Sequence, residues 1–193
     1  NTVPIARVMN KAQHQKHDRK KGTKGPHQRP HHASDNPLGL ILYGRHPVVA
    51  AINNQNREKI ALHATEKALA ALRDEVDLPH DLQTHLAAGH EIAEMIGEDA
   101  PHQGLALSVR PLPGQHIGDF APTEKRKNLV VVLDQVSDPH NVGAIMRSAA
   151  AFGARAIITP DRNSPSESGV LAKSASGALE MVPWIRVTNL SRA

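Results

Sequence analysis

The sequence predicts an α/β fold, because short apolar runs alternate with segments of helical character from residue 37 onward. The clearest run covers residues 129–133, and it is followed by a polar loop and a helix-like segment from Val142. This pattern is typical of a buried parallel strand whose following helix packs back on the sheet. The chain has only two Phe, one Tyr and one Trp, so we expect a core of Ala, Val, Ile and Leu.

Length and composition limit the possible classes of protein. A chain of 193 residues has room for one or two domains. It contains no cysteine, which excludes disulfides and thiolate metal sites and suits the reducing cytoplasm, where we expect the protein to act. No apolar run approaches the roughly 18 residues of a membrane span. The polar, basic amino terminus does not have the pattern of a signal peptide.

Positive charge is concentrated near the amino terminus. Residues 1–36 hold eight Lys or Arg against two Asp, a net charge of +6, whereas the whole chain carries +4. These residues lack hydrophobic periodicity after Met9 and are rich in Lys, His, Gly and Pro, so we expect a disordered basic tail. It would attract phosphate backbones without reading sequence, or be a solvated extension. His27, His31 and His32 have no carboxylate or thiolate at ligand spacing, so no metal site is predicted.

Residues 37–111 are predicted to form a first α/β domain. The run 38–43 is typical of a strand that Gly44 ends, and Pro47 suits the first turn of the next helix. Thr65 is a candidate cap for a later helix. The other expected elements are a helix to about residue 53, a strand at 60–63, a helix at 65–73, short helices or turns at 82–86 and 92–96, and a strand at 105–109.

Residues 112–127 are rich in Pro and Gly and are predicted to be a linker. Its basic end consists of Lys125, Arg126 and Lys127. These side chains are candidate RNA contacts, although a solvated charge run is the alternative interpretation.

Residues 128–193 are predicted to form a second domain with the order β-α-β-α-β. This order is half of a doubly wound parallel sheet with right-handed crossovers. Ligands of such sheets bind just beyond the carboxyl ends of the strands, where Asp134, Asp138, Asn141 and Arg147 gather. The expected strands are 129–134, 154–159 and 185–187, and the expected helices are 141–152 and 170–174.

The same region resembles a known family. Residues 138–149 read Asp-Pro-His-Asn-Val-Gly-Ala-Ile-Met-Arg-Ser-Ala and are followed by Phe152-Gly153. This run is similar, without a gap, to the first motif of the TrmH (SpoU) branch of the SPOUT RNA methyltransferases. Residues 174–180 and 187–190 resemble the family's K-x-S-x-G-A and T-N-L segments. Residues 43–51 and 102–104 resemble its amino-terminal substrate-binding domain, so the resemblance covers about residues 38–193.

The resemblance implies a fold, a cofactor and a partner. The fold would be a small ribosomal-protein-like α/β substrate-binding domain, followed by the first half of a SPOUT Rossmann-like parallel sheet. The family's G-x-E-x-x-G and S-L-N-V-S segments, which form a trefoil knot and hold S-adenosylmethionine, do not occur in this chain. We therefore expect a piece of a longer protein, with no identifiable cofactor-binding residue before Ala193. Family members are dimers, and the knot region forms much of their interface.

The resemblance places Asn141 and Arg147 in the catalytic site. Family enzymes use the matching arginine in the active site, sometimes as a base. A guanidinium is effectively always protonated, so orienting a phosphate or stabilising a developing oxyanion is the easier role for Arg147. A surface salt bridge is the structural alternative. Asn141 stands where the loop meets the helix, so it is a candidate N-cap as well as a catalytic residue.

Other residues have a structural interpretation beside the functional one. Asp134 and Asp138 suit turns in the loop, and Asp138 is held extended by the following proline. Gly143 is expected to allow a close approach of helix and backbone. Four residues match the family's substrate domain and are candidates for RNA binding or for bracing that domain: Arg45, His46, His102 and Gln103.

The function that the resemblance implies is methylation of a ribose 2′-hydroxyl in RNA by S-adenosylmethionine. The order of parts is most similar to bacterial enzymes that modify a guanosine of large-subunit ribosomal RNA. A transfer RNA methyltransferase and a non-catalytic RNA-binding protein of the same ancestry remain the alternatives. A nucleotide-binding protein is disfavoured, because residues 134–143 contain neither a G-x-G-x-x-G nor a P-loop pattern.

Overall fold

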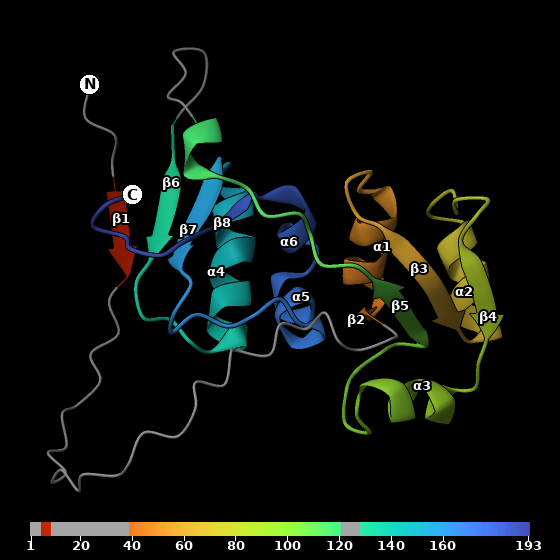
Figure 1. The fold of residues 1–193 in the computed structure, drawn as a ribbon. Coiled ribbons are helices and arrows are strands. Elements are labelled where there is room, and N and C mark those ends of the chain that lie inside the picture. Colours follow the sequence, from red (N-terminus) through yellow and green to blue (C-terminus); the bar gives the residue numbers. More distant parts are fainter. Residues whose placement is uncertain (1–4, 9–38, 121–127) are drawn as a thin grey trace, which may run out of the picture.

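Two four-stranded sheets organise the chain in the computed structural model, which describes residues 5–8, 39–120 and 128–193 (Figure 1). One sheet has the strand order β1 (Ile5–Val8), β6 (Val130–Leu133), β7 (Ala156–Pro160) and β8 (Trp184–Val187). The other has the order β2 (Leu40–Tyr43), β5 (Leu105–Val109), β3 (Lys59–Ala64) and β4 (Gln83–Leu86). The sheet β2-β5-β3-β4 and its helices, residues 39–110, are called the first unit. The β6-β7-β8 strands and their helices are called the second unit, residues 128–193.

The first unit is a mixed sheet with helices around it. β5 runs antiparallel to both β2 and β3, whereas β3 and β4 are parallel. The side chain of Thr65 caps α2 by accepting a hydrogen bond from the backbone of Ala68, as predicted. The elements are β2 (Leu40–Tyr43), α1 (Arg45–Asn53), β3 (Lys59–Ala64), α2 (Glu66–Arg73), β4 (Gln83–Leu86), α3 (Gly89–Ile96) and β5 (Leu105–Val109).

The expectation of a helix or turn at 82–86 was wrong. Leu82 and Leu86 are four residues apart, a spacing that also suits one face of a helix. Only Leu82 is buried; Leu86 is 67% exposed, and its backbone pairs with that of Ala64 in the sheet. The segment is therefore the short edge strand β4 rather than a helix.

The second unit is an all-parallel sheet, and the predicted order β-α-β-α-β is confirmed with one additional short helix, α6. Leu133 and Ile157 contribute to a core shared with the helices of this unit. Ile158 and Ile185 belong to a smaller cluster that also contains Ile117 of the 3-10 turn Ile117–Asp119. The elements are β6 (Val130–Leu133), α4 (Pro139–Ala151), β7 (Ala156–Pro160), α5 (Gly169–Ala175), α6 (Ala178–Met181) and β8 (Trp184–Val187).

A strand near the amino terminus differs from the predicted disorder of residues 1–36. β1 (Ile5–Val8) pairs in parallel with β6, with Ile5 opposite Val130. An unpaired β6 edge would expose a row of backbone donors and acceptors, and a segment containing Ile and Val is suited to pairing with it. The rest of the predicted tail lies outside the described residues.

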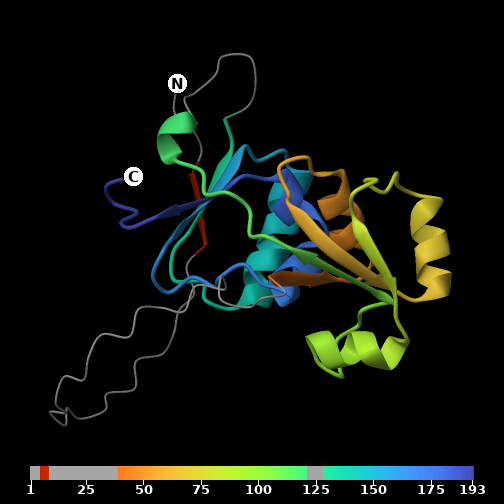
Figure 2. The ribbon, with the colours of Figure 1, turned by 45° about the vertical axis from the view of Figure 1, so that its right-hand side comes forward.

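One continuous apolar core joins the two units. It includes Leu62 and Leu72 of the first unit together with Leu133, Met146 and Leu171 of the second. Figures 1 and 2 show α5 and α6 lying between α4 and the first unit, where they contact α1. The two units therefore pack directly on each other.

The first part of the predicted linker follows the surface of the second unit. Leu112 packs against the shared core, and Gln115 forms a parallel bridge with Ile185. The basic end of the predicted linker, residues 125–127, lies outside the described residues. Within the described ranges, no helix has the length and apolar character needed to cross a membrane.

Candidate functional site

The candidate site begins where β6 ends. The loop from Asp134 to Asp138 connects this strand to α4, and Gln135 adopts a left-handed backbone conformation with φ of 59°. Val136 is buried between exposed neighbours, so it anchors the loop in the core. The polar residues that follow β6 are thus held at the carboxyl edge of a parallel sheet, the usual ligand position in such folds.

Asp138, not Asn141, caps α4. Its backbone is extended, with φ of −78° and ψ of 121°, as expected before a proline. Its carboxylate accepts a hydrogen bond from the backbone N–H of His140 at 2.9 Å. Pro139 then occupies the first helical position, where proline is favoured. The N-cap interpretation of Asn141 was therefore wrong, because Asn141 is the third residue of the helix.

Asn141 and Arg147 are both exposed on α4. Within the described ranges, neither side chain has a hydrogen bond or ion pair, so the alternative of a surface salt bridge for Arg147 is not seen there. They are six residues apart, which in an α-helix means about 9 Å along the axis and about 120° around it. The structure therefore places both on one helix but not side by side.

Gly143 brings α4 against α5. A Cβ at this position would lie 2.6 Å from the Cβ of Ser174 and 2.8 Å from the carbonyl oxygen of Leu171. The predicted close backbone approach is confirmed, with α5 as the neighbour. One turn earlier, the Nδ1 atom of His140 lies 3.0 Å from the hydroxyl oxygen of Ser174. These contacts fix the first turns of α4, from which Asn141 projects.

Gln103 links the two units at their seam. Its side-chain oxygen accepts hydrogen bonds from the backbone N–H of Arg45 at 3.0 Å and from the Nζ of Lys173 at 2.9 Å. Burial lowers the pKa of Lys173. His102 has a local role as well, since its Nδ1 accepts a hydrogen bond from the backbone of Gly104 at 3.0 Å. The hydrogen bonds of Gln103 and His102 are thus those of bracing residues.

Lys173 was not singled out from the sequence, although it directly precedes residues 174–180, the segment that resembles K-x-S-x-G-A. Lys173 of α5 contacts Gln103, which also contacts Arg45 of α1. The next residue, Ser174, contacts His140 of α4. Basic residues from α1, α5 and α4 therefore follow one another along the boundary between the units. The guanidinium of Arg45 pairs with Glu75 at 2.8 Å on the surface, a contact of small energy. His46 is exposed beside Arg45. We call Arg45, His46, Gln103, Lys173 and His140 the seam cluster.

A cavity of about 400 Å³ adjoins the seam cluster on the first unit. It lies against α2 rather than at the carboxyl edge of the parallel sheet. Its lining consists of Thr65, Lys67, Ala68, Ala71, His102, Gln103 and Gly104.

Both units match described protein families. Residues 41–115 match the family of RNA 2′-O ribose methyltransferase substrate-binding domains, and residues 128–193 match the SpoU rRNA methylase family. An α/β unit followed by a parallel sheet with a polar carboxyl edge is the architecture of this class of RNA methyltransferase. The chain belongs to the SpoU (TrmH) family.

Relatives with similar sequences are named as tRNA/rRNA methyltransferases. An uncharacterized tRNA/rRNA methyltransferase of Synechocystis is 36% identical over 166 residues, which are 79% of this chain and 41% of the relative. A Staphylococcus epidermidis protein named as a TrmH family tRNA/rRNA methyltransferase is 34% identical over 163 residues, 79% of this chain and 63% of the relative. The chain thus spans between about two fifths and three fifths of the length of these relatives.

Solved structures share the fold. The SpoU methyltransferase AviRb from Streptomyces viridochromogenes, in complex with AdoMet, superposes with a TM-score of 0.63 and 20% identity over 79% of this chain and 56% of that one. An AdoMet-bound rRNA methyltransferase from Sinorhizobium meliloti gives a TM-score of 0.60 at 20% identity, over 76% of this chain and 53% of that one. At this identity the similarity concerns the fold.

The cavity of the first unit is not assigned to the family's cofactor. The cavity of about 400 Å³ lies on the first unit, away from the loop at the carboxyl edge of β6. The side chains of Asn141 and Arg147 are exposed and have no hydrogen bond or ion pair in the described ranges. We therefore assign no described residue to the cofactor.

Proposed function

We propose that the whole protein transfers a methyl group to a ribose 2′-hydroxyl of RNA, and that its substrate is a guanosine of large-subunit ribosomal RNA. The observation that carries this proposal is the exposed α4 surface with Asn141 and Arg147, at the carboxyl edge of a parallel sheet in a SpoU family chain. S-adenosylmethionine supplies the methyl group in this proposal. The structural relatives crystallised with AdoMet support that choice of donor.

Arg147 acts on the substrate through its charge. A guanidinium does not lose its proton at neutral pH, so it is not the base that activates the hydroxyl. Its fork of donors binds a phosphate in two places and fixes the attacking ribose, or stabilises the oxyanion that develops on it. Asn141, about 9 Å away along the helix, contacts a second part of the same nucleotide.

The seam cluster holds the RNA backbone. Arg45, His46, Lys173 and His140 present positive or protonatable groups from both units, and such groups bind phosphates without reading sequence. Gln103 and His102 shape this surface, since their hydrogen bonds are made within the protein. Lys125, Arg126 and Lys127 are proposed as further phosphate contacts on the basis of their charge alone.

The test is methyl transfer by the whole protein. It would be incubated with tritiated S-adenosylmethionine and, in separate reactions, with deproteinised large-subunit ribosomal RNA and with bulk transfer RNA. Label in the first RNA at a guanosine 2′-oxygen is the expected result. Label only in transfer RNA would overturn the ribosomal assignment. RNA binding without label in either reaction would overturn the enzymatic proposal and favour a non-catalytic RNA-binding protein.

An Arg147→Ala variant tests the site itself. Loss of a charge-stabilising donor costs about a hundredfold to a thousandfold in kcat. Because Arg147 is exposed, the variant should unfold at the same temperature as the wild type. Arg162→Ala, another exposed arginine of the second unit, is the matched control and should keep its activity.

A further inference from the structure

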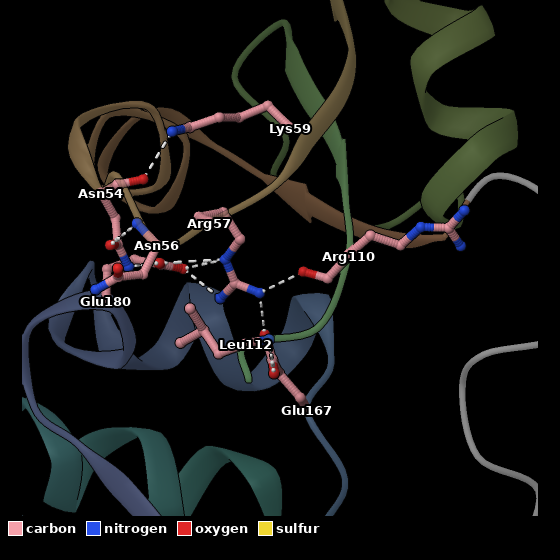
Figure 3. A network of polar contacts seen from close by, with 8 residues as sticks. All are labelled: Asn54, Asn56, Arg57, Lys59, Arg110, Leu112, Glu167 and Glu180. Carbon is pink, nitrogen blue, oxygen red and sulfur yellow. Dashed lines mark hydrogen bonds and ion pairs between the residues drawn. The ribbon is translucent and has the colours of Figure 1, made fainter. Parts of the chain in front are cut away.

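An arginine of the first unit is buried at the boundary between the units. Arg57 lies in the loop between α1 and β3 and is 2% exposed, and its side chain is fully buried. Figure 3 shows its guanidinium pointing out of the first unit toward Glu167 and Glu180. Glu167 precedes α5 and Glu180 belongs to α6, so both carboxylates come from the second unit.

The donors of this guanidinium are almost fully used. Its Nε and Nη2 both donate to the carboxylate of Glu180, which is a two-point contact. Its Nη1 donates to Glu167 at 2.6 Å and to the backbone carbonyl of Arg110 at 2.8 Å. Since a guanidinium has five N–H groups in a rigid plane, four satisfied donors fix both the position and the angle of the group.

The two carboxylates are held from the first unit and the linker as well. Glu180 accepts a hydrogen bond from the side-chain amide of Asn54 at 2.7 Å, and Glu167 accepts one from the backbone N–H of Leu112 at 3.1 Å. The side chains of Glu180 and Glu167 are 3% and 13% exposed. The network therefore ties α6 and the loop before α5 to the α1–β3 loop and to the chain that leaves β5.

Such a network contributes more to geometry than to stability. Removing charges from water costs about as much free energy as their attraction returns, so a buried ion pair adds little net stability. The apolar core already holds the units together, but apolar contact is non-directional and sets no single angle between them. The planar fork on Arg57 accepts one arrangement of its partners, and it therefore selects one angle.

We propose that Arg57, with Glu167 and Glu180, is a positioning device that locks the first unit on the second at one orientation. RNA bound to the first unit is then presented to α4 in a fixed register, and this register determines which nucleotide reaches Asn141 and Arg147. The register of the bound RNA rests on the proposed function. The fixed orientation of the two units does not depend on that function and can be tested separately.

Orientation is measured by the distance between spin labels in the whole protein. Residues 1–193 contain no cysteine, and any cysteine elsewhere in the whole protein would be replaced by serine. Ala70→Cys on α2 and Ala151→Cys on α4, both exposed, then give two defined label sites. We expect one narrow distance distribution for the wild type and a broad one for the double variant Arg57→Met/Glu180→Met, which removes both members of the two-point contact together. Arg110→Ala is the matched control, because the side chain of Arg110 is exposed and pairs only loosely with Glu58, at 3.8 Å.

Methylation provides the readout that a merely structural role would not change. On folded ribosomal RNA, which spans both units, the double variant should lose about tenfold to a hundredfold in kcat/KM, since misplacement by about 1 Å can have this effect. Label should also spread to neighbouring nucleotides. On a short oligonucleotide that reaches only α4, kcat should equal that of the wild type.

The outcomes separate the two proposals. If the double variant does not fold, Arg57→Lys keeps the charge and loses the fork, and it should broaden the distance distribution in the same way. Narrow distributions in all variants, with unchanged choice of nucleotide, would overturn the lock. If the wild type methylates no RNA, the proposed function fails, and the distance measurement still decides whether Arg57 fixes the orientation.

Discussion

His63 of β3 and His85 of β4 stack across the parallel strand pair, with ring centroids 5.0 Å apart. Burial lowers the pKa of His63, and the neighbouring His85 lowers it further. The folded state therefore disfavours the charged imidazole more than the unfolded chain does. When the pH falls below the ordinary histidine pKa of about 6.5, His63 binds a proton in the unfolded chain but stays neutral in the folded protein until its lowered pKa is reached.

This difference predicts an acid-sensitive contribution to stability. The contribution of His63 is fully present above pH 6.5 or so and is lost as the pH falls toward its lowered pKa. The free energy of unfolding in urea should thus be smaller at pH 5.5 than at pH 7.5, and His63→Gln should reduce this difference. His90→Gln changes an exposed histidine and serves as control. An unchanged pH dependence in His63→Gln would show that other groups cause it.

A second residue-scale prediction concerns the start of α4. Replacing the N-cap Asp138 by Ala should cost about 1 kcal/mol of stability, and Asn should restore most of it. Asn141→Ala, on an exposed side chain three residues later, should change stability by less than about 0.5 kcal/mol. Thermal unfolding of these three variants measures the changes in stability. The reverse order of effects would return the capping role to Asn141.

At the scale of elements, the packing of α4 on α5 depends on one missing side chain. Glycine within a helix is normally about 0.5 to 1 kcal/mol less favourable than alanine. At Gly143 the better helix propensity of alanine is outweighed by a steric clash. An added Cβ would lie 2.8 and 2.9 Å from backbone atoms of Leu171 and Ala175. Backbone atoms cannot rotate away as the end of a side chain can, so α5 would have to shift.

Gly143→Ala should therefore destabilise the protein by about 1 to 3 kcal/mol, the usual cost of overpacking. Gly114→Ala is the matched control, since no atom lies within 4 Å of the Cβ it would add. Urea unfolding of both variants gives the comparison. Equal stability of Gly143→Ala and the wild type would mean that α4 and α5 can separate without cost.

Elements formed by neighbouring residues could be predicted from the sequence, whereas contacts across the chain could not. The strand at 129–134, its polar loop and the need for a close approach at Gly143 follow from local pattern. The edge strand β4 was missed because Leu82 and Leu86 suit a helix equally well until their burial is known. Arg57 and Glu180 are 123 positions apart, so no local pattern could pair them.

At the scale of the whole molecule, the shared core couples the two units. Leu72 of α2 is 1% exposed and belongs to the same cluster as Leu133 and Leu171 of the second unit. Because each unit covers apolar surface of the other, neither is expected to unfold while the other stays intact. A pair of loosely linked domains would unfold in two separate transitions. We expect a single transition for this protein instead.

The single tryptophan, Trp184, makes this coupling measurable. It lies in β8 of the second unit and donates a hydrogen bond from Nε1 to Thr159 at 2.9 Å, so its fluorescence reports on that unit. Leu72→Ala, in the first unit, should cost about 2 to 5 kcal/mol. The fluorescence transition should shift to lower urea together with the circular dichroism transition. Leu86→Ala, at a leucine that is 67% exposed, should shift neither. A fluorescence transition that stays in place while circular dichroism shifts would show that the units unfold separately and that the core does not couple them.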